Sequence, residues 1–404
     1  MQMMVALPKL HKGQRQVWDS PARFDVLACG RRWGKTRLGA LRCMTVGLRG
    51  GRAWWVAPSY PMSTVGWRLI KRLSGPVPGT EKREVDRLIV YPGGGEVQVK
   101  SADNPDSLRG EGLNFLVMDE CAFIKEAAWA EALRPALSDR RGKALFISTP
   151  KGRNWFWRLW QMGQDSSRSE WHAWRFPTAD NPFIQADEIE AARQLLPERV
   201  FAQEYLAEFL DDSGAVFRHV VEAANAQAEH SAQPGHDYVM GVDWGKHNDF
   251  TVLTVLDVTS RSMVCLDRFN QIDYTVQMGR LKALYDRFKP RAIVAEVNAM
   301  GEPLVEQLRR ERLPVYPFTT TNATKSSIVD ALTLAFEQGD IHILPEPVLI
   351  AELQAFEMER LPSGMFRYGA PEGMHDDTVM SLALAWQAAT TTARAKVVTV
   401  EMRA

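Results

Sequence analysis

The chain has 404 residues, 49 basic and 49 acidic side chains, a hydrophobic fraction of 45% and a charged fraction of 24%. This composition is typical of a globular protein with two domains, and the sequence lacks the run of roughly 18 apolar residues that a membrane helix needs. The four cysteines are scattered without a C-x-x-C pair, which argues against a disulfide framework or a zinc site, and the N-terminus does not have the pattern of a signal peptide.

The zero net charge hides an asymmetry between the two halves. Residues 1–210 hold 31 Lys and Arg against 23 Asp and Glu, whereas residues 211–404 hold 18 against 26. The first half could therefore meet a phosphate backbone electrostatically while the second half repels it. Ordinary variation of surface charge explains the same numbers, and the sequence leaves both explanations open.

Short apolar runs alternate with helix-like stretches in the first 150 residues. The strand-like runs are 24–29, 52–58, 113–120 and 143–149, and the helix-like stretches are 35–48, 62–73 and 126–138. This alternation predicts an α/β domain with a mainly parallel sheet flanked by helices. Ligand sites in such sheets lie at the carboxyl ends of the strands, where these runs end in polar residues.

The rest of the chain predicts a helical lid, a linker and a second α/β domain. Residues 155–210 are Trp-rich and then charged, which indicates a small helical lid that completes a first domain of residues 1–210. Residues 211–236 are polar and Ala-rich, as expected for a linker. Residues 237–404 begin with three strand-like runs, followed by a helix, a strand and a helix, which is the order of a ribonuclease-H-like domain.

The stretch CGRRWGKT (29–36) matches the phosphate-binding pattern G-x-x-x-x-G-K-[ST] except at Cys29, where the pattern has glycine. It follows a strand and precedes a helix, which is the expected context. Its backbone N–H groups would cradle phosphates, Lys35 would reach the β and γ phosphates, and Thr36 would bind Mg²⁺. A Gly-rich turn with a surface lysine is the alternative. The expected nucleotide-binding residues are Gly30, Arg31, Arg32, Trp33, Gly34, Lys35 and Thr36.

A second motif, LVMDE (116–120), is an apolar strand that ends in two acids. Asp119 would hold Mg²⁺ through water, and Glu120 would polarise the attacking water. Two acids at a strand end are common, but about 80 residues after a phosphate-binding loop they indicate a Walker-B motif. The two motifs together predict an ATPase.

Three acidic motifs in the second half, GVDWG (241–245), VAEVN (294–298) and GMHDD (373–377), predict a metal-dependent nuclease. Asp243, Glu296, Asp376 and Asp377 could converge on two divalent ions that clamp a phosphodiester, and oxygen ligands favour Mg²⁺ or Mn²⁺. Each acid also has a structural explanation, such as a helix cap for Asp376. Adjacent residues on a helix point about 100° apart, so one of the Asp pair should dominate. Asp249 and His375 are candidate supporting groups.

Taken together, ACGRRWGKT, SADNPDSLRGEGLNFLVMDE and FISTPKG resemble the ATPase half of the large terminase subunit, the DNA-packaging motor of tailed phages. The acidic motifs and the segment 319–345 resemble the nuclease half of the same family. The resemblance covers residues 10–390 approximately. It implies a P-loop ATPase domain followed by a ribonuclease-H-like nuclease domain. Cys29 is the visible departure.

The resemblance also implies roles for individual residues. Arg31 would sense the γ-phosphate, and Arg109 would be the arginine finger, in cis or in trans, or else a loop arginine that positions the Walker-B segment. Thr149 lies in the coupling motif STP, and Gln14 would read the adenine edge. Lys325 would contact a backbone phosphate, or it is simply an exposed lysine at a helix start.

As a terminase, the protein would use ATP and Mg²⁺ to move double-stranded DNA into a procapsid and would cut concatemeric DNA with Mg²⁺ or Mn²⁺, two ions being expected. Its implied partners are DNA, the portal protein, the small terminase subunit and copies of itself in a pentameric ring on the portal, with a monomer in solution as the alternative. It would act in the host cytoplasm and transiently on the procapsid, without a membrane. The rival interpretations are a helicase-like ATPase-nuclease of DNA repair or restriction, and a non-catalytic docking subunit.

Overall fold

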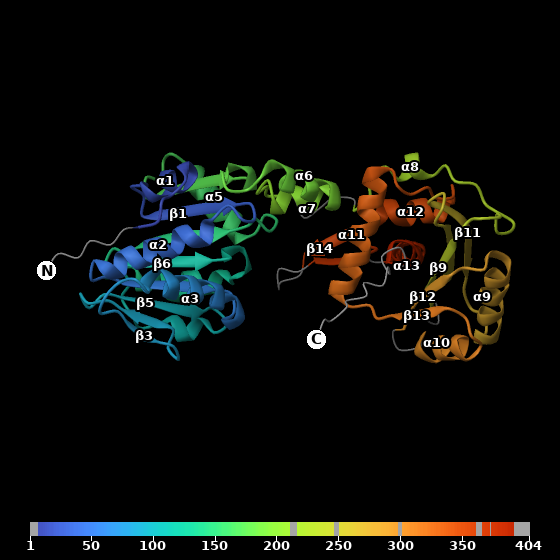
Figure 1. Cartoon of the computed structure of the whole chain (residues 1–404), viewed down its shortest axis with the longest axis horizontal. Helices are drawn as coiled ribbons and strands as arrows, with labels where there is room; N and C mark the ends of the chain where they lie inside the picture. Colours follow the sequence, from blue (N-terminus) through green and yellow to red (C-terminus); the bar gives the residue numbers. More distant parts are fainter. Residues whose placement is uncertain are drawn as a thin grey trace, which may run out of the picture. The chain divides into compact units, whose positions relative to one another are not determined.

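A computed structural model describes residues 7–210, 216–245, 250–297, 301–360, 366–371 and 373–391. The chain separates into two compact units, Met1–Asp211 and Asp212–Ala404 (Figure 1), and each is described by itself. Within the described ranges, no helix is long and apolar enough to span a membrane.

The first unit is built on an eight-stranded sheet with the order β3-β4-β5-β2-β6-β7-β1-β8. Its parallel part comprises β1 (Phe24–Cys29), β2 (Arg52–Ala57), β5 (Glu96–Ser101), β6 (Phe115–Asp119), β7 (Lys143–Ser148) and β8 (Trp171–Phe176). At one edge, β3 (Glu81–Arg83) and β4 (Leu88–Val90) are antiparallel. The predicted α/β class and mainly parallel sheet are confirmed.

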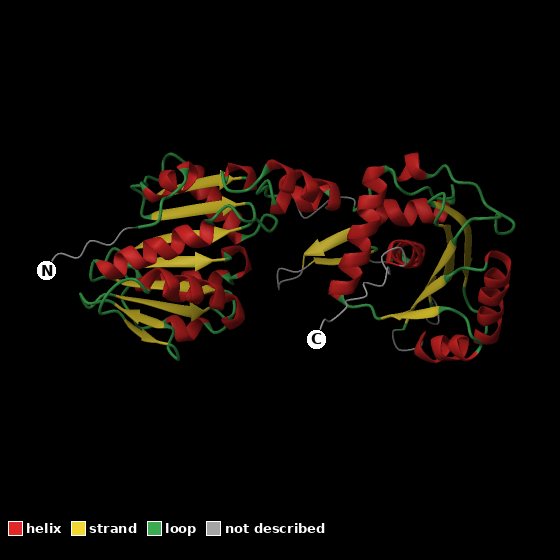
Figure 2. Cartoon of the chain, viewed as in Figure 1, coloured by secondary structure: helices red, strands yellow, loops and turns green. Residues whose placement is uncertain are grey.

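Alternate residues of each central strand face two separate apolar cores, so helices cover both faces of the sheet (Figure 2). Val26 and Ala28 face one core, which includes α5 (Trp155–Gln164), the π-helix Ala128–Leu133 and the short α4 (Arg134–Ala136). Leu27 and Cys29 face the other, with α1 (Lys12–Trp18), α2 (Lys35–Leu48) and α3 (Tyr60–Ser74). Burial on both faces explains why these strands are apolar throughout.

Three parts of this unit differ from the sequence-based expectation. Residues 155–210, expected as a helical lid, do contain α6 (Ala186–Leu195) and α7 (Glu198–Glu204), but also β8, which extends the main sheet beside β1. The edge strands β3 to β5 were not predicted, and β3 has the fully exposed sequence EKR, which carries no apolar signal. The helix expected at 126–138 is present over residues 126–136, but its central part, Ala128–Leu133, is a π-helix.

The second unit has a five-stranded sheet with the order β11-β10-β9-β12-β13. The strands are β9 (Tyr238–Asp243), β10 (Thr251–Asp257), β11 (Ser262–Phe269), β12 (Ala292–Glu296) and β13 (Val315–Phe318). The first three are antiparallel to one another, and β12 and β13 run parallel to β9. The expected order of three strands, helix, strand and helix is confirmed by α9 (Tyr274–Phe288) and α10 (Gly301–Arg310).

Helices cover both faces of the second sheet as well. Met240 and Val242 of β9 pack in a core with α9 and α10. Val239 packs in another core with α8 (Val220–Ala223), α11 (Asn322–Gln338), α12 (Pro347–Ala355) and α13 (Asp377–Thr391). Phe217 and Val220, within the expected linker, are buried in this second core. A two-stranded hairpin of β14 (Glu357–Arg360) and β15 (Phe366–Gly369) completes the described part of the unit.

Candidate active sites

The loop between β1 and α2 has a backbone shape that depends on glycine. Arg32 (φ 61°) and Gly34 (φ 104°) are in the left-handed region. At Gly34, the N-cap of α2, the positive φ strains any other residue, and a Cβ would lie 2.7 Å from the side-chain Nε2 of Gln14. The loop therefore leads directly into a helix N-terminus, whose N–H groups and dipole favour an anion.

The ammonium group of Lys35 brings residues from three strand ends together. It is buried, and its Nζ lies 3.2 Å from Thr149 Oγ1 and 3.3 Å from Glu120 Oε1. Lys35 follows β1, Glu120 follows β6 and Thr149 follows β7, and these three strands are neighbours in the sheet. The phosphate-binding loop, the acidic pair and the STP motif therefore meet at the carboxyl edge of the sheet.

The two acids after β6 have different surroundings. Asp119 is buried, and burial together with the charge of Glu120 raises the pKa of its carboxyl to about 7. Glu120 has a left-handed backbone (φ 47°), and its carboxylate accepts a hydrogen bond from the Ser148 hydroxyl at 3.4 Å. A non-glycine residue in this conformation costs on the order of 1 kcal/mol, and such costs concentrate at functional sites.

Residues after β8 hold the phosphate-binding loop in place. The Thr178 hydroxyl donates to the Arg31 carbonyl at 2.8 Å, and the Asn181 amide donates to the Arg32 carbonyl at 2.7 Å. The buried carboxylate of Glu204 pairs with both Arg31 and Lys151, and these two cations lower the pKa of Glu204 against the effect of its burial. No local motif surrounds Thr178, Asn181 or Glu204, so these contacts could not be predicted from the sequence.

The same segment explains the residues at the start of the loop. A Cβ on Gly30 would lie 2.5 Å from both Thr178 Oγ1 and the Tyr205 carbonyl oxygen, so glycine is required there for close packing. Cys29 is instead the last residue of β1 and is fully buried, and burial raises the pKa of its thiol well above the usual value. The departure from the motif therefore falls on a strand residue.

The remaining expected nucleotide-binding residues have mixed surroundings. Gln14 is buried and donates to the Gly34 carbonyl at 3.1 Å, and its side-chain oxygen accepts from the His11 N–H. The Trp33 ring is buried and stacks on Phe176 at 4.8 Å, so only its backbone can serve a phosphate. Thr36 is partly buried in the first turn of α2.

Arg109 lies on the surface of the first unit, at the end of the 3₁₀ turn Pro105–Leu108. About half of its side chain is exposed (53%), and it pairs with Asp106 at 3.0 Å and Glu131 at 3.3 Å. Its role as an arginine finger stays a prediction.

In the second unit, Asp243 and Glu296 lie side by side at the ends of parallel strands. The register pairs Val242 with Ala295, which brings the following residues opposite each other. Asp243 is buried, and its pKa is raised well above the usual value, first by burial, then by a hydrogen bond to Glu296 and by the charges of Glu296, Asp377 and Asp376. Two carboxyl groups in a hydrogen bond share one proton, because like charges at this distance resist joint ionisation.

The two acids at the start of α13 take different partners. Asp377 accepts a hydrogen bond from the Phe250 N–H at 3.3 Å, and burial raises the pKa of its carboxyl to about 6. Asp376 pairs with Lys325 at 2.8 Å, so the lysine considered for a DNA phosphate contacts an acid of the site. The charge of Asp377 raises the pKa of Asp243 more than that of Asp376 does, and which of the two is the principal metal ligand stays a prediction.

Glu296 hydrogen-bonds to Asp243, and the charges of Asp377 and Asp376 also act on it. Among the residues that the structure describes, no group of three or more His, Cys, Asp or Glu side chains is already arranged to hold a metal ion. The oxygen-only donor set still fits a hard divalent cation, which would take the place of the proton shared by Asp243 and Glu296. His375 lies 3.6 Å from Asp377 Oδ2, and Asp249 lies outside the described residues.

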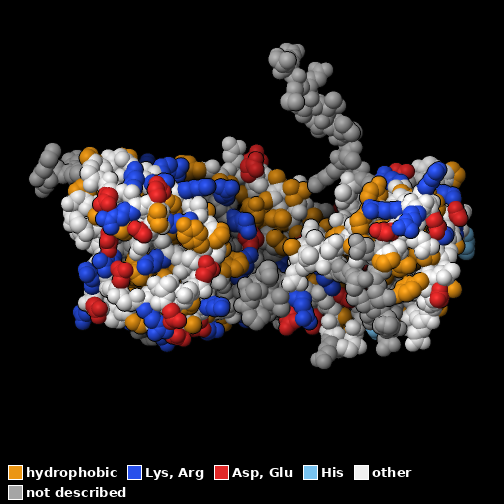
Figure 3. Space-filling model, turned by 90° about the horizontal axis from the view of Figure 1, so that it is seen from below, with side chains coloured by type: hydrophobic (Ala, Val, Ile, Leu, Met, Phe, Trp, Pro, Cys, Tyr) orange, Lys and Arg blue, Asp and Glu red, His pale blue; other side chains and the backbone are white. Residues whose placement is uncertain are grey.

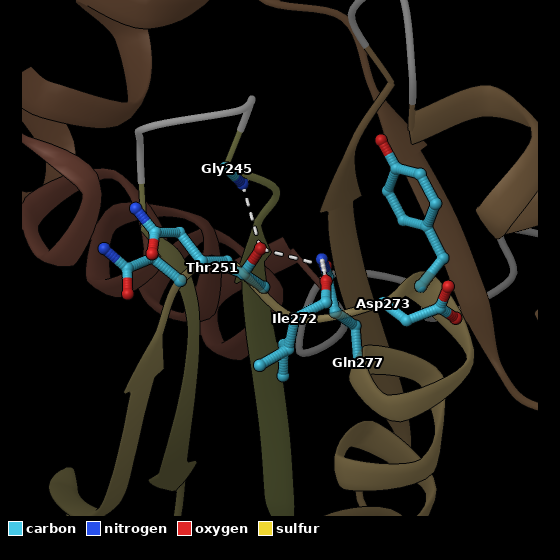
Figure 4. Close-up of a pocket in the computed structure, with 8 residues that line it drawn as sticks. Gly245, Thr251, Ile272, Asp273 and Gln277 are labelled. Atoms are coloured by element: carbon cyan, nitrogen blue, oxygen red, sulfur yellow. Dashed lines mark hydrogen bonds between the residues drawn. The ribbon is translucent and has the colours of Figure 1, made fainter.

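A polar network fixes the backbone just beyond Asp243 (Figure 4). The Gly245 N–H donates to Thr251 Oγ1 at 3.0 Å, and the Thr251 hydroxyl donates to Gln277 Oε1 at 3.0 Å. The Gln277 amide then donates to the Ile272 carbonyl at 3.0 Å. These groups line a cavity of about 370 Å³, and they connect the end of β9 to β10 and α9.

Together, the fold and the two sites define a P-loop ATPase domain followed by a ribonuclease-H-like nuclease domain. Residues 26–220 match the family described as "Terminase large subunit, T4likevirus-type, N-terminal", and residues 240–389 match "Terminase RNaseH-like domain". The chain belongs to the terminase large subunit family, as its relatives also show.

The chain is 31% identical over 433 residues to the terminase large subunit of Thermus virus P23-45, with 94% of this chain and 87% of the relative covered. It is 27% identical over 343 residues to that of Escherichia phage T5, covering 80% and 76%. A large terminase from a thermophilic bacteriophage has the same fold, with a TM-score of 0.61 and 13% identity over 94% of this chain and 99% of that one. The protein is therefore a DNA-packaging terminase with an ATPase unit and a nuclease unit, and membership implies DNA and packaging partners in general.

Proposed function

We propose that ATP hydrolysis in the first unit drives double-stranded DNA into a procapsid, and that the second unit cuts concatemeric DNA when packaging starts and ends. The observation that carries the proposal is the contact of Lys35 with Glu120 and Thr149, which joins the phosphate-binding, hydrolytic and coupling motifs at one point. The acids around Asp243 add a second centre in the same chain.

In the ATPase unit, Lys35 and the backbone N–H groups that follow Gly30 bind the phosphates, and Gln14 reads the adenine. Thr36 and Asp119 hold Mg²⁺, which neutralises charge on the phosphates when bound. Glu120 orients and polarises the attacking water, and its contact with Lys35, the residue proposed to bind the γ-phosphate, supports this role. Burial and the charge of Glu120 raise the pKa of Asp119 to about 7, so a cation bound by this carboxylate would displace a proton from it.

Two arginines complete the assignment of the ATPase site. Arg31 senses the γ-phosphate from within the loop, where Glu204 pairs with its guanidinium. Arg109 supplies positive charge to the transferring phosphoryl group, in cis or in trans. Its exposure on the surface leaves it accessible to a neighbouring subunit.

In the nuclease unit, Asp243, Glu296, Asp377 and Asp376 hold Mg²⁺ or Mn²⁺, with two ions expected. Ions held by these carboxylates would stabilise charge on the attacking and leaving oxygens of the phosphodiester. Asp243 and Glu296 must release their shared proton, and Asp377 must be ionised, before they can act as ligands. The Gly245 to Gln277 network keeps the backbone after Asp243 in a fixed position.

The partners proposed for this chain are double-stranded DNA, the portal protein, the small terminase subunit and further copies of itself in a pentameric ring on the portal. The site of action is the host cytoplasm and, transiently, the procapsid. On the face seen in Figure 3, basic and acidic side chains are interspersed over the first unit, so the net charge of its sequence does not form one basic patch there.

Plasmid cleavage and ATP turnover by the full chain, with Lys35→Ala and Asp243→Ala, test the proposal. We expect Lys35→Ala to lose ATP turnover and keep metal-dependent cleavage, and Asp243→Ala to do the reverse. Loss of both activities in either variant would contradict two separate centres. Strand separation by the wild-type chain would favour the helicase-like alternative, and nucleotide binding without turnover would favour the docking subunit.

A further inference from the structure

A carboxylate that the acidic motifs do not include lies behind the nuclease centre. Glu352 is on α12, which lies beside α13 in the second unit (Figure 1), and its side chain is only 6% exposed. Its neighbours on α12, Leu349 and Leu353, are fully buried core residues. Burying a charged group in such a core costs free energy unless hydrogen bonds or an opposite charge compensate. The contacts of the Glu352 carboxylate therefore show what its burial achieves.

Glu352 caps the helix that begins with Asp377. Its Oε2 accepts hydrogen bonds from the Thr378 N–H at 2.9 Å and from the Thr378 hydroxyl. This backbone N–H is in the first turn of α13, where a local acid normally serves as the acceptor, and Asp376 occupies the usual capping position. The cap therefore comes from a residue 26 positions away in the chain. Asp376 pairs with Lys325 instead, and Asp377 accepts from Phe250.

The other carboxylate oxygen of Glu352 is linked to Asp377 through a circuit of contacts that includes Arg268 and Phe250. Arg268, on β11, lies 3.6 Å from Glu352 Oε1, and its guanidinium lies over the Phe250 ring, 3.3 Å from the ring centroid. Phe250 donates the backbone N–H that Asp377 accepts. Since Thr378 follows Asp377 directly, the circuit fixes both the backbone and the carboxylate of Asp377.

We propose that Glu352, supported by Arg268, is a positioning residue of the nuclease centre, which caps α13 in place of Asp376 and so keeps the carboxylates of Asp376 and Asp377 out of the helix cap, where a divalent cation can reach them. The inference rests on the proposed nuclease function and adds to it a residue that no acidic motif marks. Without Glu352, Asp376 is the nearest acceptor for the exposed N–H groups of α13. A carboxylate engaged there is lost as a cation ligand.

The test measures Mn²⁺ binding to the full chain by titration calorimetry, with the Mn²⁺ dependence of plasmid cleavage beside it. Loss of a group that orients a metal ligand typically weakens metal affinity about 10- to 100-fold. We therefore expect Glu352→Ala to weaken Mn²⁺ binding by at least about tenfold, with cleavage largely restored at high Mn²⁺. Glu352→Gln keeps an acceptor for Thr378 and should lose less, and Arg268→Met should fall between the two.

Asp257→Asn is the matched control. Asp257 is also a buried acid of this unit, but it lies outside the acidic motifs, and it pairs with His236 and accepts a hydrogen bond from the Ser260 hydroxyl. It should lower stability without changing the Mn²⁺ affinity. ATP turnover checks that each variant has folded in the first unit, and circular dichroism checks the whole chain. If Glu352→Ala does not fold, Glu352→Gln and Arg268→Met still decide the question.

Unchanged Mn²⁺ affinity in folded Glu352 and Arg268 variants would overturn the positioning role and leave Glu352 as a cap that only stabilises the helix. A wild-type chain that binds no Mn²⁺ and cuts no DNA would overturn the proposed nuclease itself. The two failures are therefore distinguishable.

Discussion

In the first unit, Glu120 of the acidic pair contacts the ammonium of Lys35, whereas in the second unit Asp243 shares a hydrogen bond with Glu296. In the first site, the ammonium of Lys35 balances part of the negative charge of the acids. In the second site, the proton shared by Asp243 and Glu296 does so only while it stays bound. The first site is thus prepared for an anionic nucleotide by its own side chains, and the second is prepared for a cation that replaces a proton.

The largest effect expected from this difference is at Glu120. Glu120→Gln keeps the size of the side chain and removes the carboxylate that polarises water, so ATP turnover should fall by about 10²- to 10⁴-fold. Nucleotide binding should persist because Lys35 and the loop remain. Phosphate release and equilibrium binding of a fluorescent ATP analogue measure the two properties.

Plasmid cleavage by the same variant serves as the control and should match the wild type. A Glu120→Gln chain that hydrolyses ATP at the wild-type rate would show that another group polarises the water.

The pH dependence of the free energy of unfolding should show that protons, and not a lysine, balance the charge of the second site. Asp377 has a folded pKa of about 6 against an ordinary value of 3.8, and the pKa of Asp243 is raised further in the same direction. A carboxyl with a raised folded pKa stabilises the fold below its unfolded pKa, and this contribution is lost as the pH rises through the folded value. A bound cation stabilises the ionised form instead.

The stabilisation of the second unit by Mg²⁺ or Mn²⁺ should therefore grow as the pH rises through about 6, by several °C in melting temperature. Calorimetric scans of the full chain, with cation and with EDTA, give the difference at each pH. Asp377→Asn should flatten its pH dependence. A cation effect that is constant with pH would contradict the proposed exchange of proton for metal.

A smaller effect is expected where the loop of the first unit is held by Glu204. Glu204→Gln removes the charge that pairs with Arg31 and Lys151, and Lys151 is largely buried. The loss should be about 1–2 kcal/mol in the free energy of unfolding, because one partner is exposed and the amide can still accept hydrogen bonds. Urea denaturation of the full chain, followed by fluorescence of its tryptophans, measures it.

Glu126→Gln is a matched control for Glu204→Gln, since Glu126 pairs with Arg158 and both side chains are more than half exposed. It should change stability by less than about 0.5 kcal/mol. Equal losses in the two variants would mean that the loop contact adds nothing beyond a surface ion pair.

The central strands and both acidic sets could be predicted from the sequence, because each rests on a local pattern. β1, β6 and β7 are apolar runs that end in polar residues, and a parallel sheet brings such ends to one edge. The same rule explains why Asp243 and Glu296 lie side by side, since the structure shows their strands to be parallel neighbours.

The residues that could not be predicted act through contacts between distant segments. Glu204 contacts a loop 173 residues earlier, and Glu352 caps a helix that starts after it in the chain. Neither residue lies in a motif. In the sequence each looks like an ordinary surface acid, and only the fold shows that it is buried. β3 was not predicted because it has no apolar residues. It forms by pairing with β4 at the edge of the sheet.

The lysine beside each acidic site is expected to have a different role in the two units. The effect of replacing the lysine in the second unit is the smallest that we predict. Lys35 contacts Glu120, and Lys325 contacts Asp376 in a comparable pair. In the first unit the lysine is proposed to bind the substrate, so its removal should abolish turnover. In the second unit the lysine competes with a cation for the same carboxylate, so Lys325→Met should strengthen Mn²⁺ binding by about two- to fivefold, the size expected for a partly exposed ion pair.

Titration calorimetry with Mn²⁺ gives this affinity, and raising the salt concentration should reduce the difference between Lys325→Met and the wild type, because salt screens the ion pair. Lys289→Met is a suitable control, since Lys289 pairs with Asp286 in the same unit and both side chains are mostly exposed. Weaker Mn²⁺ binding in Lys325→Met would reverse the interpretation: the ammonium would then hold Asp376 in place for the cation, and the lysines of the two sites would both serve to orient an acid.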